Sequence, residues 1–234
     1  MRICGLIKLS LLDYPEKLAA TVFTGGCNLR CPFCHNGSLV LHPENVEGIS
    51  ENELMDFLSS RIGKLEGVCI TGGEPLLEPE LESFIKKIRS LGFLIKLDTN
   101  GSFPDRLKNL MEKGLLDYVA MDIKNSPEKY AETVGIEGFD PAPIFKSAEL
   151  LMGGNVPFEF RTTMVREMHK AEDIEKIGIA LKGAPRFFIQ NFEDSGDLIG
   201  FEGRSLELHG FSDSELEVFR GILAQYIDKV EIRN

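Results

Sequence analysis

The chain lacks several features that would place it in common classes of protein. It has no run of about 18 apolar residues, which a membrane-spanning helix needs. Its short apolar N-terminal stretch is broken by Lys8 and Asp13 and has no small-residue cleavage site, so we expect no signal peptide. It has no basic excess either: its net charge is −11, whereas nucleic-acid binders usually present a basic face. The sequence predicts a cytoplasmic protein without a membrane or nucleic-acid partner.

Internal repeats and long low-complexity linkers are also missing. The 234 residues, 43% of them hydrophobic and 27% charged, are enough to bury a sizeable core. We therefore expect a single domain over residues 1–234, with a core over about 18–192. An N-terminal loop is expected over 1–17, and a C-terminal helix and short strand over about 212–233. The loose stretch 191–205 is expected to form a long loop over the carboxyl ends of the strands.

Apolar runs alternate with segments of helical period along the chain. Strands are predicted over 19–24, 66–71, 93–98, 117–122, 158–165 and 186–192, with a short one over 229–233. Helices are predicted over about 51–62, 79–91, 104–114, 127–134, 142–152, 171–182 and 213–227. Six strand–helix units with helical crossovers predict an α/β fold with parallel strands. Polar residues gather after nearly every strand, which favours a partial (β/α)6 TIM-like barrel over an open, doubly wound sheet.

Five cysteines are present, an odd number, and Cys27, Cys31 and Cys34 fall within eight residues. In a cytosolic chain such crowding indicates a metal or catalytic site rather than a disulfide framework. A structural zinc site would need a fourth ligand, and His35 is a poor candidate because adjacent residues rarely both reach one metal. Cys69 lies in a predicted strand and is interpreted as a small packed hydrophobe. The other interpretation is a [4Fe–4S] cluster held by three thiolates, which leaves one iron with an open position.

Three further motifs follow predicted strands. "TGGEP" (71–75) follows the second strand; taken alone, it indicates only a tight turn. "KLDTNG" (96–101) and "AMDIK" (120–124) end the third and fourth strands. Helix capping and turn formation would explain some of their polar residues, such as Asn100. Capping and turn formation explain Asp122 and Lys124 less well, because charged residues at a buried strand end need a further reason. These two residues are therefore candidate binding residues.

The cysteine spacing, with Phe33 before the last cysteine and "TGGEP" after the next strand, resembles the radical S-adenosylmethionine (SAM) superfamily. The resemblance implies that the amino and carboxylate groups of SAM occupy the open iron. It also implies reductive cleavage of SAM to a 5′-deoxyadenosyl radical that abstracts a hydrogen atom. The protein's task would be to bind and orient the reactants and to shield the radical. "GLIKLSLLDYP", "CPFCHN", "GVCITGGEP", "KLDTNG", "LLDYVAMDIK" and "EFRTTMV" resemble the glycyl-radical-enzyme activases. Within them, they are most similar to the activating proteins of anaerobic ribonucleoside-triphosphate reductase.

The resemblance also implies a role for each matching residue. The cluster ligands would be Cys27, Cys31 and Cys34. The residues beside the adenine would be Phe33, His35 and Asn36, with Gln190, Asn191 and Phe192 closing that side. The SAM amino group would be held by Gly72, Gly73 and Glu74. The SAM carboxylate would be lined by Asp98, Thr99 and Asp122, where some activases hold a monovalent cation, and Lys124 would also face the cofactor. A cation in this chain is a hypothesis. Arg161 or Arg166 would approach the ribose or the carboxylate. Asp13, expected in a loop near the carboxyl ends of the strands, would touch the partner's glycine loop.

Residues 35–50 contain no cysteine, so we expect no auxiliary cluster, and the electron would come from flavodoxin or ferredoxin. The expected partner is a glycyl radical enzyme, anaerobic ribonucleotide reductase first. Three alternatives stay open: another glycyl radical enzyme as partner, a small-molecule enzyme resembling 7-carboxy-7-deazaguanine synthase, and a non-enzymatic zinc- or cluster-bearing protein. The remaining histidines, His42, His169 and His209, are expected at the surface.

Overall fold

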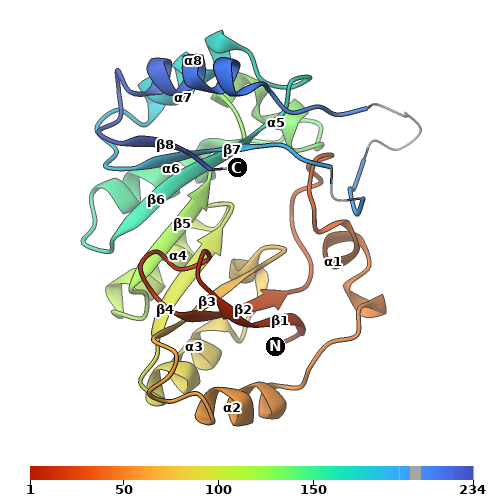
Figure 1. Cartoon of the computed structure of the whole chain (residues 1–234), viewed down its shortest axis with the longest axis vertical. Helices are drawn as coiled ribbons and strands as arrows, with labels where there is room; N and C mark the ends of the chain where they lie inside the picture. Colours follow the sequence, from red (N-terminus) through yellow and green to blue (C-terminus); the bar gives the residue numbers. More distant parts are fainter. Residues whose placement is uncertain (195, 201–206, 234) are drawn as a thin grey trace. The chain divides into compact units, whose positions relative to one another are not determined.

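The computed structural model describes residues 1–194, 196–200 and 207–233 and has an α/β fold (Figure 1). Residues 195 and 201–205 of the predicted loop over 191–205 lie outside the described residues. The chain divides into two compact units. The first holds residues 1–28, 38–99 and 103–120, and the second holds 29–37, 100–102 and 121–234. The strand order in the sheet is the chain order, β1 to β8, and the sheet is not closed.

The first unit is built on β1 (Ile3–Ser10), β2 (Ala19–Thr24), β3 (Gly67–Gly72) and β4 (Leu94–Thr99). Its helices are α2 (Glu51–Ser59), α3 (Leu81–Ser90) and α4 (Pro104–Glu112), with short 3-10 turns η1 (Pro43–Asn45) and η2 (Pro75–Leu77). The short helix α1 (Gly37–Leu41) begins at the boundary between the units. Strands β2, β3 and β4 are parallel, with Thr24 opposite Gly72 and Ile70 opposite Leu97.

The N-terminal segment differs from the predicted loop over 1–17, because Ile3–Ser10 forms β1, which pairs antiparallel with β2. This edge strand keeps only part of its surface buried, so its sequence lacks the apolar run of the central strands. The connection from β1 to β2 lies at the amino end of β2, whereas the cysteine loop follows its carboxyl end. Asp13 lies in that connection and accepts a 2.5 Å hydrogen bond from Thr21. The expectation that Asp13 lies near the carboxyl ends of the strands is therefore wrong.

The second unit contains β6 (Phe158–Met164), β7 (Phe187–Asn191) and β8 (Val230–Arg233), which are parallel. Its helices are α5 (Tyr130–Thr133), α6 (Ala142–Met152), α7 (Ala171–Ala180) and α8 (Asp213–Leu223), with the 3-10 turn η3 (Pro127–Lys129). In Figure 1, α7 and α8 lie side by side, next to β7 and β8. Strand β5 (Tyr118–Asp122) gives its first three residues to the first unit and its last two to the second.

Burial of apolar side chains stabilises these strands and the helices that pack on them. In β3, Val68, Cys69 and Ile70 are all fully buried, so both faces of the strand are covered, as parallel strands require. Helix α3 buries Phe84, Ile85 and Ile88 along one stripe, and each such side chain contributes about 1.5–3 kcal/mol. Within the described residues, no helix has the length and apolar character needed to cross a membrane.

Candidate active site

The ends of β2 and β3 are packed together through glycines. A Cβ atom on Gly72 would lie 2.3 Å from the backbone nitrogen and oxygen of Thr24, and Gly72 has φ = +118°. A Cβ atom on Gly73 would lie 1.8 Å from the carbonyl oxygen of Gly26. The amide of Gly73 donates to Thr24 O at 3.0 Å, and the amide of Glu74 donates to Gly26 O at 2.8 Å. The glycine pair thus allows the "TGGEP" loop to bond directly to the backbone that leads into Cys27.

The carboxylate of Glu74 is fully buried and organises this loop. Its Oε1 accepts a 2.9 Å bond from the amide of Leu76 and a 2.8 Å bond from the hydroxyl of Thr99. The first bond satisfies an amide at the start of η2, and the second ties the loop after β3 to the end of β4. Glu74 and Thr99, two of the predicted site residues, are therefore in direct contact.

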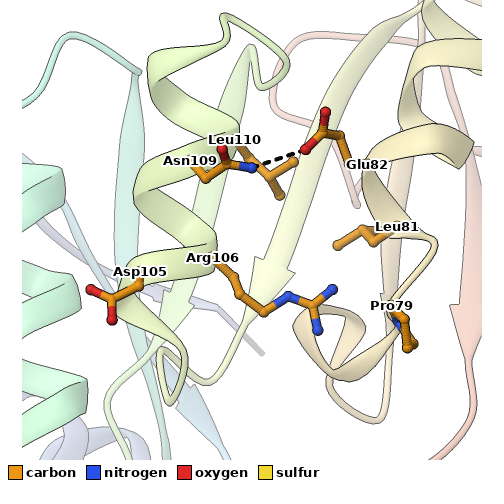
Figure 2. A pocket seen from close by; sticks show the side chains of 7 residues that line it. All are labelled: Pro79, Leu81, Glu82, Asp105, Arg106, Asn109 and Leu110. Carbon is orange, nitrogen blue, oxygen red and sulfur yellow. Dashed lines mark hydrogen bonds between the residues drawn. The ribbon is translucent and has the colours of Figure 1, made fainter.

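Helix α4 supports the same loop from outside. Arg106 donates to the carbonyl oxygen of Leu77 at 3.2 Å and also to that of Glu78. Figure 2 shows its side chain reaching from α4 toward the segment that carries Pro79. A cavity of about 310 Å³ lies here, lined by Pro79, Leu81, Glu82, Asp105, Arg106, Asn109 and Leu110. Because Arg106 satisfies two carbonyl groups at the end of η2, it fixes the position of the "TGGEP" loop.

Sequence reasoning missed Lys96, which is only 2% exposed in the middle of β4. Its ammonium group forms an ion pair with Oδ1 of Asp98 and lies 3.8 Å from Sγ of Cys69. The same Sγ lies 3.6 Å from Oδ1 of Asp98. Cys69 is buried, as predicted, but between charged groups rather than as a plain hydrophobe. The signal that could have found Lys96 is a lysine inside an otherwise apolar parallel strand, because a buried ammonium needs an anionic partner.

In the second unit, Asp122 pairs with two positively charged side chains. Its Oδ1 accepts from Nε of Arg161 at 2.5 Å, and its Oδ2 accepts from Nζ of Lys124 at 3.0 Å. Burial alone would raise the pKa of Asp122, but the charges of Arg161 and Lys124 outweigh it and hold the pKa well below its usual range. Burial alone would lower the pKa of Lys124, but Asp122 and the thiols of Cys31 and Cys34 hold it above its usual range. Both groups therefore stay charged at neutral pH.

The cysteine loop fits a thiolate-bound cluster by the chemistry of its donors. Burial raises the pKa of Cys34, while the backbone amide of Asn36 and the charge of Lys124 act in the opposite direction. A cation beside the thiols favours the thiolate form that binds metal. Within the described residues, no three His, Cys, Asp or Glu side chains are arranged around a single metal ion. The fit of Cys27, Cys31 and Cys34 to a cluster thus rests on the donor set, three thiols in one short stretch of the chain.

Backbone bonds hold the cysteine loop from two sides. The amide of Arg30 donates to the carbonyl of Val134 at 2.9 Å. On the other side, the amide of Gly200 donates to Pro32 O at 2.9 Å, and that of Gly37 donates to Asp197 O at 3.0 Å. The described part of the predicted loop over 191–205 therefore packs on the cysteine loop.

Two of the residues expected near adenine are in ring contact. The centroids of His35 and Phe192 lie 5.6 Å apart, with the rings tilted at 51°. Phe33 is buried, whereas His35 is exposed, so His35 offers an aromatic face. Such a face can stack on a planar base.

Two other predicted residues form structural contacts. Arg166 makes a bidentate pair with Glu215, at 2.7 and 2.6 Å, and its guanidinium lies 4.8 Å from the ring centroid of Phe211. Asn191 exchanges two hydrogen bonds with the backbone of Phe211, at 2.9 and 2.8 Å. Both side chains thus anchor the segment that leads into α8. Between Arg161 and Arg166, only Arg161 is bonded to a predicted site residue within the described residues.

His169 corrects a second expectation, because it is 2% exposed rather than at the surface. Its Nε2 lies 2.8 Å from the carbonyl oxygen of Lys124, and its Nδ1 lies 3.0 Å from the amide nitrogen of Val165. The amide of Lys124 in turn donates to the hydroxyl of Tyr130 at 3.1 Å. Burial lowers the pKa of His169, so the ring is neutral at neutral pH. Neutral His169 and Tyr130 together fix the backbone of Lys124.

An α/β fold of parallel strands, with a three-cysteine loop after β2 and a glycine loop after β3, is the architecture of an iron–sulfur enzyme that uses SAM. The chain belongs to the Radical SAM superfamily, whose family model matches residues 21–178. Members use a [4Fe–4S] cluster and SAM, and the cysteine motif of this chain fits that use. The prediction of a radical SAM enzyme is confirmed.

The chain is similar to several known proteins, which match different shares of its length. A protein of Methanocaldococcus jannaschii with the provisional name glycyl-radical enzyme activating enzyme MJ1227 is 35% identical over 99% of this chain and 95% of its own length. The 7-carboxy-7-deazaguanine synthase of Methanopyrus kandleri is 35% identical over 45% of this chain and 48% of its own. The crystal structure of Streptococcus suis SuiB matches with a TM-score of 0.69 at 14% identity, covering 92% of this chain and 48% of that one. The structural match supports the fold alone, and the predicted α/β fold class is confirmed.

Proposed function

We propose that this protein is a radical SAM activase that introduces a radical into a glycine of a glycyl radical enzyme. The observation that carries the proposal is the full-length similarity to the activating enzyme of Methanocaldococcus jannaschii. A cluster held by Cys27, Cys31 and Cys34 would supply one electron for the reductive cleavage of SAM to methionine and a 5′-deoxyadenosyl radical. This radical would take a hydrogen atom from the partner's glycine and leave as 5′-deoxyadenosine. A glycine Cα–H suits this reaction because the product radical is delocalised over both flanking amides.

The residues of this chain would bind and orient SAM. Gly72 and Gly73 would present backbone to the SAM amino group, on a loop that Glu74 holds in place. Arg161 and Lys124, already paired with Asp122, would face an anionic group of SAM. His35, Phe192 and Phe33 would line the adenine side, with Asn36 beside Cys34. These assignments follow the motif positions, and the contacts within each unit are consistent with them.

We propose anaerobic ribonucleoside-triphosphate reductase as the partner, on the combined resemblance of the "DYP", "KLDTNG" and "AMDIK" segments. The electron would come from flavodoxin or ferredoxin, because residues 35–50 hold no further cysteine for a second cluster. Both assignments are finer than the activase class, and the partner is tested separately from it.

The test is to incubate the anaerobically reconstituted protein with SAM, a reductant and the reductase, and to record electron paramagnetic resonance spectra. We expect a glycyl radical on the reductase and one 5′-deoxyadenosine per radical formed. A reductase whose radical glycine is changed to alanine is the control and should give no signal. A radical on another glycyl radical enzyme but none on the reductase would overturn the partner; SAM cleavage without a radical on any glycyl radical enzyme would overturn the activase class.

A second candidate is a small-molecule radical SAM enzyme, favoured by the similarity to 7-carboxy-7-deazaguanine synthase over 45% of this chain. It predicts formation of 7-carboxy-7-deazaguanine by the protein alone. Detection of that product by mass spectrometry, without a protein partner, would support it over the activase. If the protein carries an active cluster but forms none of this product, the small-molecule candidate is ruled out.

A further inference from the structure

Lys96 places a positive charge inside the first unit, where the activase mechanism assigns it no role. Its side chain is almost fully buried, and its ammonium group is paired with Oδ1 of Asp98. An ammonium group in such a place is unfavourable unless an anion lies beside it. Lys96 and Asp98 lie two residues apart on β4, so their side chains point to the same face of the strand. The pair is therefore built into one strand and does not depend on the arrangement of loops.

The position of this pair connects it to the glycine loop. Asp98 is followed by Thr99, whose hydroxyl donates to the buried carboxylate of Glu74 at 2.8 Å. Sγ of Cys69 on the neighbouring β3 lies within 4 Å of both charged groups. Lys96 therefore neutralises Asp98, one residue before the end of β4 and directly beside Thr99, which contacts the glycine loop.

A monovalent cation at Asp98 does not fit these contacts. A cation bound by the Asp98 carboxylate would share it with the ammonium of Lys96, which is paired with Oδ1. It would also lie close to a buried like charge, which is unfavourable. In the second unit, Asp122 likewise has its own cations, Arg161 and Lys124, one on each oxygen. Each aspartate thus has at least one counter-charge within its own unit.

We propose that Lys96 is the internal counter-ion of Asp98 and that it makes SAM binding independent of any monovalent cation. Lys96 is a positioning residue: it acts through Asp98 and need not touch SAM. The proposal rests on the SAM site described above, but it concerns binding and not the radical partner. It predicts that SAM binding will depend on a monovalent cation once the ammonium group of Lys96 is removed, whereas SAM binding by the natural protein does not.

The experiment measures SAM affinity of the cluster-loaded protein by equilibrium dialysis in sodium, potassium and choline chloride at equal ionic strength. For the natural protein we expect affinities that agree within about twofold in all three salts. For Lys96→Met we expect affinity about tenfold lower or more in choline, because the Asp98 carboxylate loses the buried charge of Lys96. Sodium or potassium should restore most of it. Lys108→Met, which removes an exposed lysine from an i,i+4 pair with Glu112, is the matched control and should behave as the natural protein does.

The possible results of this experiment distinguish the proposal from its failure. Natural protein that binds SAM about tenfold more weakly in choline would overturn the proposal, as would Lys96→Met with natural affinity in choline. If Lys96→Met does not fold, the double variant Lys96→Met with Asp98→Asn removes both charges; it should fold and show no cation effect, and a cation effect there would also overturn the proposal. No SAM binding in any salt would refute the site and the proposal together. Radical transfer to a partner is not measured, so failure of the activase assignment leaves these results unchanged.

Discussion

A Cβ atom on Gly73 would lie 1.8 Å from the carbonyl oxygen of Gly26, the shortest such distance at any glycine of the first unit. The contact joins the loop after β3 to the loop that carries Cys27. The resemblance implies that the glycine pair holds the SAM amino group, and the structure shows that the pair also lets the two loops bond to each other.

Gly73→Ala is expected to disrupt this contact. Because the obstructing atom belongs to the backbone, the two loops must separate, and we expect a loss of about 1–3 kcal/mol in the free energy of unfolding. SAM affinity should fall as well, because the amide of Glu74 loses its bond to Gly26. Urea unfolding and equilibrium dialysis measure the two effects. Gly221→Ala is the control: it lies in α8 with open space around its Cα and should be neutral or slightly stabilising. Natural stability and affinity in Gly73→Ala would contradict the structure.

The two arginines that the sequence could not separate should now differ. Arg161→Met removes one of the two cations that pair with Asp122 within the described residues, and we expect SAM affinity to fall about tenfold or more, because a charge is removed from a partly buried network. Arg166→Met removes an exposed pair with Glu215, worth about 0–1 kcal/mol of stability, and should leave SAM affinity within about twofold. Equilibrium dialysis of both variants decides; the reverse order of effects would show that Arg166, not Arg161, faces SAM.

Much of the fold and the main motifs could be predicted because they depend on local patterns. The buried parallel strands form continuous apolar runs, as β3 does, and the cysteine and glycine motifs are contiguous in the chain. β1 was missed because an edge strand with one exposed face lacks such a run. The number of strands was therefore underestimated, although the α/β class was right.

The side-chain contacts could not be predicted, because they join residues far apart in the sequence. His169 follows a polar turn and looks like a surface residue, yet it bonds to the backbone of Lys124, 45 residues away. Arg166 follows β6 as a site residue would, yet Glu215 of α8 holds it. Lys96 could have been found, since a lysine in a buried strand requires a partner, but its partner Asp98 had been assigned to the cofactor alone.

Each cysteine of the motif should be needed for the cluster. Cys27→Ser, Cys31→Ser and Cys34→Ser should each lower the iron content of the reconstituted protein well below about four atoms per chain, because only three thiolates are available. Cys4→Ser is the control: Cys4 is buried in β1 and should leave the iron content unchanged, even if stability falls slightly. Iron and sulfide analysis with the visible absorption spectrum measures this. Full iron content in any of the first three variants would remove that cysteine from the ligand set.

His169 should make the stability of the protein depend on pH. Burial lowers its pKa below the ordinary value of 6.5, so the folded state binds fewer protons than the unfolded state once the pH falls below about 6.5. Stability from the neutral ring is therefore fully present above that value and is lost as the pH falls toward the folded pKa, by up to about 1.4 kcal/mol per pH unit. Urea unfolding of the natural protein between pH 7.5 and about 5.5 should show this decrease.

His169→Gln separates the ring from other titrating groups. Glutamine can donate to the carbonyl of Lys124 but does not titrate, so we expect lower stability at pH 7.5 and a smaller decrease on acidification than in the natural protein. His209→Gln is the matched control, because His209 is exposed and pairs with Glu167; its acid dependence should resemble that of the natural protein. Equal pH slopes for the natural protein and His169→Gln would show that His169 is not held neutral, and the backbone of Lys124 would then need another support.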